Sequence, residues 1–93
     1  MSNIIKIEKM VQESLEDIEE IKNRYEYLLD KENKKNLDSL KQLIESIVLL
    51  VSNIKDRGRD INSKRVEQME KVRKHVSNIK ENCIFMRKEI KSL

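Results

Sequence analysis

Residues 43–54 constrain the fold of this chain more than any other segment, because only four of these twelve side chains are polar: Glu45, Ser46, Ser52 and Asn53. As a helix, the segment presents apolar side chains in nearly every direction, and such a helix requires cover from more than one neighbour. Its twelve residues would form a helix about 18 Å long. A helix that crosses a bilayer needs about 20 apolar residues, which is about 30 Å. The segment therefore predicts a core helix at the centre of a helical bundle and no membrane span.

The composition favours helix along the whole chain. The sequence contains no proline and a single glycine, Gly58, so almost nothing interrupts a helix. Charged residues make up 40% and hydrophobic residues 38% of the 93 residues, a balance that fits one folded domain rather than a disordered chain or a membrane protein. We therefore expect a single all-α domain over residues 1–93.

Three segments carry apolar residues at alternating steps of three and four, the heptad spacing of helices that pack side by side. We call each set a seam. The first seam contains Ile4, Ile7, Val11, Ile18, Ile21, Tyr25 and Leu28, with the polar Ser14 in the same row. The second contains Leu37, Leu40, Ile44, Ile47, Val51 and Ile54, and the third contains Met69, Val72, Val76, Ile79, Cys83, Met86, Ile90 and Leu93. The seams predict helices at residues 3–30, 36–56 and 61–93, with Ser2 as the first N-cap.

The connections between these helices decide the architecture. Gly58 can adopt the left-handed conformation that ends a helix, so we predict a hairpin turn at residues 57–60. Residues 30–36 contain no apolar side chain and shift the heptad phase, but they lack glycine and proline, which favours a continuous helix with a phase slip over a loop. This arrangement is an elongated antiparallel helical hairpin that assembles into a multi-helix bundle. A turn at residues 30–36 would instead produce a three-helix bundle.

In the hairpin arrangement the first helix overhangs, and its seam has no cover within the chain. We therefore predict that this seam pairs with another copy or with a helix of another protein. The predicted interaction residues of the seam are Ile4, Ile7, Val11, Ile18 and Ile21. Apolar side chains beside the second and third seams widen the predicted surface, namely Val48, Leu49, Leu50, Ile84 and Phe85.

The charges are distributed unevenly. Residues 1–30 contain eight acidic and four basic residues, whereas residues 57–93 contain five acidic and eleven basic residues. Arg73, Lys80 and Arg87 repeat every seven residues beside the third seam, a column suited to an acidic neighbouring helix, although bases at such positions often only cover apolar surface with their stems. The acids of the first helix fall on its outer face, where we expect them to be solvated or to meet another molecule: Glu13, Glu16, Glu19 and Glu20.

The sequence offers little for catalysis, metal binding or nucleic-acid binding. His75 is the single histidine and lacks an identifiable acid or nucleophile partner, and the single cysteine, Cys83, is interpreted as a small core residue. We predict no enzyme activity, no cofactor and no metal site. Residues 55–74 hold eight bases, but four acids lie among them and no aromatic residue is available for stacking, which argues against nucleic-acid binding.

These observations favour a non-enzymatic coiled-coil structural or adaptor subunit that mediates protein–protein assembly, as a homo-oligomer or with other helical subunits. The alternative is a small all-α secretion-type chaperone or regulator whose apolar face binds an amphipathic client helix, and a nucleic-acid-binding helical protein ranks third. Lys6, Glu8 and Lys9 interrupt the first apolar residues, which is unlike a signal peptide, so a cytoplasmic or nuclear location is expected.

Overall fold

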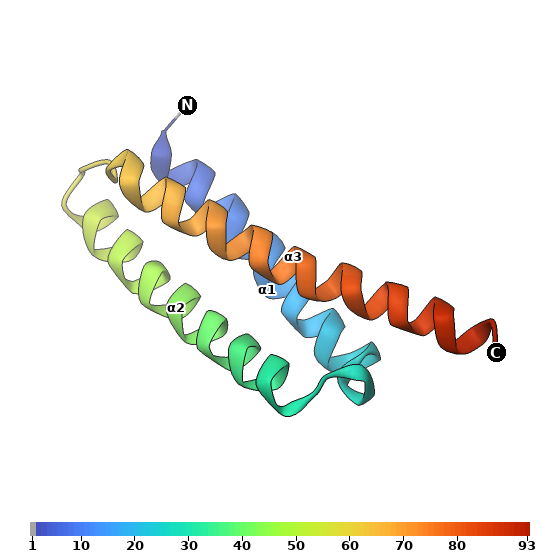
Figure 1. Ribbon diagram of the computed structural model, residues 1–93. Helices are drawn as coiled ribbons and strands as arrows, with labels where there is room; N and C mark the ends of the chain where they lie inside the picture. The colour runs from blue at the N-terminus through green and yellow to red at the C-terminus, as the bar shows by residue number, and fades with distance from the viewer. Residues whose placement is uncertain (1) are drawn as a thin grey trace.

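The computed structural model describes residues 2–93, and over this range the chain forms three α-helices, of which α2 runs antiparallel to α1 and α3 (Figure 1). The helices are α1 (Asn3–Arg24), α2 (Lys31–Asp56) and α3 (Ser63–Lys91), with a short 3₁₀ helix, η1 (Glu26–Leu28), between α1 and α2. The bundle is elongated and measures 55 × 24 × 19 Å. The prediction of an all-α helical bundle is confirmed.

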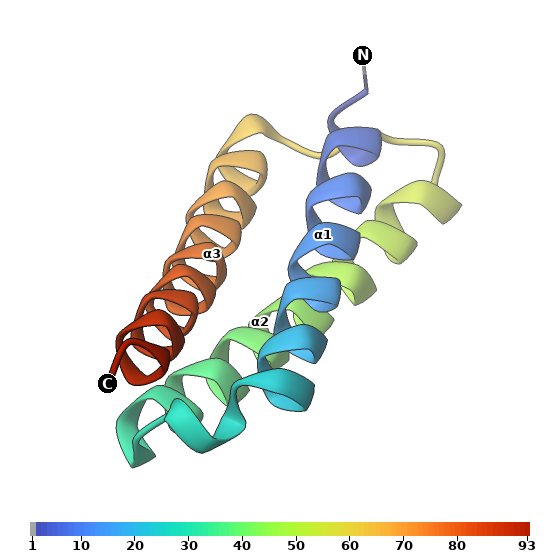
Figure 2. The same cartoon turned by 90° about the vertical axis from the view of Figure 1, so that its right-hand side faces the viewer.

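Of the two arrangements weighed from the sequence, the structure adopts the three-helix bundle. α1 folds back and packs most extensively against α3, with further contacts to α2. Figures 1 and 2 together show α1 running alongside the other two helices instead of projecting from them. The helix that projects is α3, whose C-terminal end extends past η1 (Figure 1). Ile90 and Leu93 are therefore 53% and 105% exposed, although their spacing had placed them on the third seam.

The first reversal lies at residues 25–30, so α1 ends at Arg24 instead of residue 30, and the continuous helix with a phase slip that the sequence favoured is wrong. Tyr25 ends α1 with its N–H donating to the Ile21 carbonyl at 2.9 Å, and Leu29 is extended. Tyr25 and Leu29 are only 6% and 9% exposed, so apolar contacts hold the turn against the bundle. The Asp30 carboxylate then accepts from the Asn33 N–H at 2.8 Å and caps α2. The core helix consequently begins at Lys31 instead of residue 36.

The second reversal confirms the expectation for Gly58, which has a φ of 66°. The Gly58 N–H donates to the Lys55 carbonyl at 3.0 Å, and the Arg59 N–H donates to the Ile54 carbonyl at 3.1 Å. These two bonds form a Schellman motif, in which a left-handed residue satisfies the last carbonyls of a helix. The connection continues to Asn62, whose side chain accepts from the Lys64 N–H at 2.8 Å, so α3 begins at Ser63 instead of residue 61.

Asp60 in this connection holds the start of α1. Its carboxylate accepts from the Asn3 N–H at 3.2 Å, the Ile4 N–H at 3.0 Å and the Ser2 hydroxyl at 3.2 Å. Ser2 also caps α1 as predicted, because its Oγ accepts from the Ile4 N–H at 3.1 Å. The Asn3 side-chain amide donates to the Ile61 carbonyl at 2.9 Å, and the Ile61 side chain is buried. The first helix is thereby attached to the α2–α3 connection.

The core lies between the three helices and is built mainly from the seams. Its buried apolar residues are Ile4, Ile7, Val11, Ile18, Ile21, Tyr25, Leu29, Leu37, Ile44, Ile47, Val51, Ile61, Met69, Val72, Val76, Ile79 and Cys83. The segment at 43–54 does not occupy the centre of the bundle as expected. It buries Ile44, Ile47 and Val51 on one face, whereas Val48 and Leu49 remain 42% and 68% exposed. The reason is that α1 and α3 pack most closely with each other, which leaves α2 covered on one side.

Candidate helix-binding groove

The first seam is covered within the chain. Ile4, Ile7, Val11, Ile18 and Ile21 are each at most 8% exposed, because α3 and α2 lie over them. In the folded chain these five side chains are packed inside the bundle, and of them Ile7 and Val11 also border a groove between α1 and α2. This corrects the expectation that they form the principal assembly surface, which assumed that α1 overhangs.

The basic column beside the third seam also finds its acidic neighbour inside the chain, and that neighbour is α1. Lys80 Nζ lies 2.7 Å from Glu20 Oε2 and 3.0 Å from Asp17 Oδ1. Arg73 Nη1 lies 3.9 Å from Glu13 Oε2, and the Arg87 guanidinium carbon lies 5.9 Å from the centroid of the Tyr25 ring. Glu13 and Glu20 are thus engaged with α3, which corrects the expectation that they are solvated or meet another molecule.

These contacts change the protonation equilibria at the α1–α3 interface. The hydrogen bond from Lys80 lowers the pKa of the Glu20 carboxyl. The hydrogen bonds to Glu20 and Asp17 raise the pKa of Lys80. The ion pairs remain partly exposed, so their contribution to stability is modest and serves mainly to align the two helices.

A groove between α1 and α2 is the apolar surface that the three seams leave open. It has a volume of about 640 Å³, and its apolar lining consists of Ile7, Val11, Leu15, Val48 and Val51. Three of these five side chains are valines, whose short side chains leave space between the two helix backbones. Leu15 is partly buried and Val48 is 42% exposed, so both side chains are accessible from the open side of the groove.

The polar rim of this groove contains three acidic residues, one basic residue and two neutral ones. It is formed by Glu8, Gln12, Glu16 and Glu19 of α1 and by Ser52 and Lys55 of α2. Lys55 Nζ lies 3.3 Å from Glu8 Oε2, so this pair joins the two helices near the end of the groove that faces the α2–α3 connection. The arrangement of an apolar floor between polar walls is typical of surfaces that bind an amphipathic helix.

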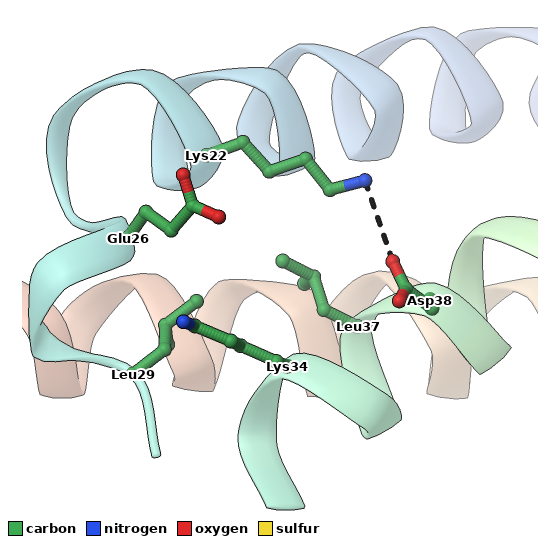
Figure 3. A pocket seen from close by; sticks show the side chains of 6 residues that line it. All are labelled: Lys22, Glu26, Leu29, Lys34, Leu37 and Asp38. Carbon is green, nitrogen blue, oxygen red and sulfur yellow. Dashed lines mark ion pairs between the residues drawn. The ribbon is translucent and has the colours of Figure 1, made fainter. Parts of the chain in front are cut away.

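Toward the α1–α2 turn, a neighbouring hollow of about 410 Å³ is lined by Leu15, Ile18, Glu19, Lys22, Asn23 and Lys41. A further hollow of about 200 Å³ there is lined by Lys22, Glu26, Leu29, Lys34, Leu37 and Asp38. Figure 3 shows Lys22 of α1 reaching across to Asp38 of α2 beside Leu37, with the Nζ and Oδ1 atoms 3.4 Å apart. Charged side chains therefore border the apolar surface at this end.

The other predicted interaction residues do not come together. Leu49 is exposed on the outer face of α2, Leu50 and Ile84 are partly buried against the core, and Phe85 is 63% exposed on α3. Of the residues chosen beside the second and third seams, only Val48 lines the groove. The predicted interaction residues did not include Leu15 or Glu8, whereas Glu16 and Glu19 had been expected on the outer face of the first helix, solvated or in contact with another molecule. The signal for Leu15 was its position immediately beside the first seam.

The described part of the chain does not contain a cluster of three or more His, Cys, Asp or Glu side chains that could hold a metal ion. His75 is exposed on α3, and burial raises the pKa of the Cys83 thiol. Across residues 2–93, every helix is too short or too polar to cross a membrane.

In comparisons with known proteins, no protein family, no curated protein and no solved structure matches this chain.

Proposed function

We propose that this chain is a non-enzymatic helical interaction module that binds a helix of another protein in the groove between α1 and α2. The observation that carries the proposal is the accessible apolar floor at Leu15 and Val48, which remains after the bundle has closed its own seams. A fourth helix laid in this groove would cover that floor and complete a four-helix bundle.

The proposal replaces assembly through the seams with binding at one groove, because the seam side chains are used inside the monomer. The proposal also modifies the chaperone alternative. In that alternative a client helix binds the apolar face of the α2–α3 hairpin, but α1 occupies this face, so a client helix would bind in the groove instead. A partner helix would place side chains at positions i, i+3, i+4 and i+7 against the floor. Burying one aliphatic side chain of that helix contributes about 1.5–3 kcal/mol, an upper estimate.

The test uses a fluorescent designed peptide of about 20 residues, about 30 Å long as a helix, with leucines along one stripe and uncharged polar residues elsewhere. Fluorescence anisotropy should show saturable binding to the full chain. Val48→Glu should weaken binding by at least about tenfold, because it places a charge where the partner removes water.

Leu49→Glu is the matched control, since the same change is made one residue later on the outer face of α2, where Leu49 is 68% exposed. This variant should bind as the unmodified chain does. Circular dichroism should show that both variants stay helical. Absence of peptide binding, or equal losses in the two variants, would refute the proposed function.

A further inference from the structure

The acids of α1 divide into two sets with different surroundings. One set faces α3 and is compensated there by Lys80 and Arg73: Glu13, Asp17 and Glu20. The other set lines the groove with α2: Glu8, Glu16 and Glu19. In this second set, Glu8 is paired with Lys55 at 3.3 Å, and the Gln12 amide donates to Glu16 at 3.3 Å without compensating its charge.

The groove therefore has walls of unequal charge. The α1 wall presents Glu16 and Glu19, which lie one helical turn apart and are both exposed. The α2 wall presents the uncharged Ser52 beside Val48, followed by Lys55, which is paired with Glu8, while Lys41 of α2 lines the neighbouring hollow together with Glu19. The groove lining therefore contains three acidic residues and one basic residue, although the whole chain has a formal net charge of +3.

We infer, on the basis of the proposed function, that the partner is an amphipathic helix with lysine or arginine residues along one flank of its apolar stripe. These bases would lie one turn apart, in register with Glu16 and Glu19, while the opposite flank of the helix would be uncharged against Ser52. Electrostatic complementarity of this kind selects the partner and its orientation more than it adds affinity.

A second copy of this chain does not supply such a helix. The basic column of α3 is engaged with α1 and Tyr25. The projecting end of α3 exposes Ile90 and Leu93 on one face, but its exposed residues 88–93 cover only about 9 Å, whereas the groove follows residues 7–19 of α1 over about 18 Å. The occupant is therefore a helix of a different protein.

The inference is tested with three peptides that share one leucine stripe and differ only along one flank, which carries lysine, glutamine or glutamate. Affinity for the full chain should fall in that order, with about a tenfold difference between the lysine and glutamate peptides, because each exposed ion pair changes affinity by a factor of about two to five. The difference should be large at about 0.01 M salt and nearly vanish at about 1 M, where the screening length is about 3 Å.

The double variant Glu16→Gln/Glu19→Gln should lose most of this preference while still binding the glutamine peptide. The matched control is Glu67→Gln/Glu70→Gln, which makes the same change in net charge on the exposed face of α3 and should keep the preference. Equal binding of all three peptides, with Val48→Glu still abolishing it, would overturn the inference and leave the proposed function standing.

The remaining outcomes also decide the question. If none of the three peptides binds, the proposed function fails and the inference fails with it. A lysine preference that persists in Glu16→Gln/Glu19→Gln would place its source outside the groove and overturn the inference. Light scattering that shows a dimer disrupted by Val48→Glu would identify a second copy as the occupant, which contradicts a partner of basic character.

Discussion

At the scale of single residues, Ser14 is the position where the core departs from the seam pattern. It is 0% exposed, and its hydroxyl has no hydrogen-bond partner among residues 2–93. A buried hydroxyl without a partner costs about 1–3 kcal/mol, and serine is about 0.5 kcal/mol poorer than alanine within a helix. We expect Ser14→Ala to raise the free energy of unfolding by about 1 kcal/mol, as measured by urea denaturation.

The control for this substitution is Ser39→Ala, at an exposed position of α2, which reports helix propensity alone. Its gain should be about 0.5 kcal/mol or less. A loss of stability in Ser14→Ala would contradict the prediction, because it would mean that the hydroxyl accepts or donates a hydrogen bond in solution.

At the scale of the elements, Asp60 couples the start of α1 to the α2–α3 connection. The hydrogen bond from the Asn3 N–H, together with those from Ile4, Ile61 and Ser2, lowers the pKa of the Asp60 carboxyl below its ordinary value of 3.8. A carboxyl with a lower pKa in the folded state stabilises the fold above its unfolded pKa, and this stabilisation is lost as the pH falls through the folded pKa. The stability of the bundle should therefore decrease below about pH 4.

Asp60→Asn should lower the melting temperature at pH 7 and reduce the further loss below about pH 4, because the substituted side chain no longer titrates. Thermal unfolding followed by circular dichroism across this pH range measures both effects. Asp56→Asn, at an exposed carboxylate at the end of α2, is the control and should not lower the melting temperature. If the melting temperature of Asp60→Asn falls below about pH 4 as much as that of the unmodified chain, other carboxyls, including Glu20, dominate the loss of stability in acid.

Most of the element-level structure follows from the sequence, whereas the position of the first turn does not. The seams predicted the buried side chains of α1, such as Ile7 and Ile21, because heptad spacing depends only on residues of one helix. Gly58 was predictable for a similar local reason. The reversal at residues 25–30 contains no glycine or proline, and Tyr25 and Leu28 continue the seam spacing through it. The one local indication of a turn was Asp30, a residue type that often caps the start of a helix. A single possible cap is weaker evidence for a turn than an uninterrupted apolar pattern is for a continuous helix.

At the scale of the whole molecule, we expect α1 to be necessary for the other two helices to fold. Its fully buried isoleucines Ile7 and Ile21 alone contribute about 3–6 kcal/mol of burial, comparable with the total stability of about 5–15 kcal/mol for a small domain. We expect deletion of residues 1–23 to abolish cooperative unfolding and most of the helical signal in circular dichroism.

Deletion of residues 88–93 is the matched control, because all six residues are exposed on the projecting end of α3. This shorter chain should remain helical and unfold cooperatively. If the chain without residues 1–23 also unfolds cooperatively, α2 and α3 form an independent hairpin, and α1 is dispensable for the fold.

The sequence by itself determined that the chain is helical, which face of each helix is apolar, and that α2 ends just before Gly58, because these depend on spacing and backbone preferences within a few residues. Only the tertiary structure decided that α1 covers the seams of α2 and α3 and that its acids divide between α3 and the groove. The physical reason is that a seam specifies which face must be buried but not which helix buries it. An overhanging α1 covered by another protein and an α1 folded back in the same chain bury the same side chains, and the buried turn at Tyr25 and Leu29 selects the second arrangement.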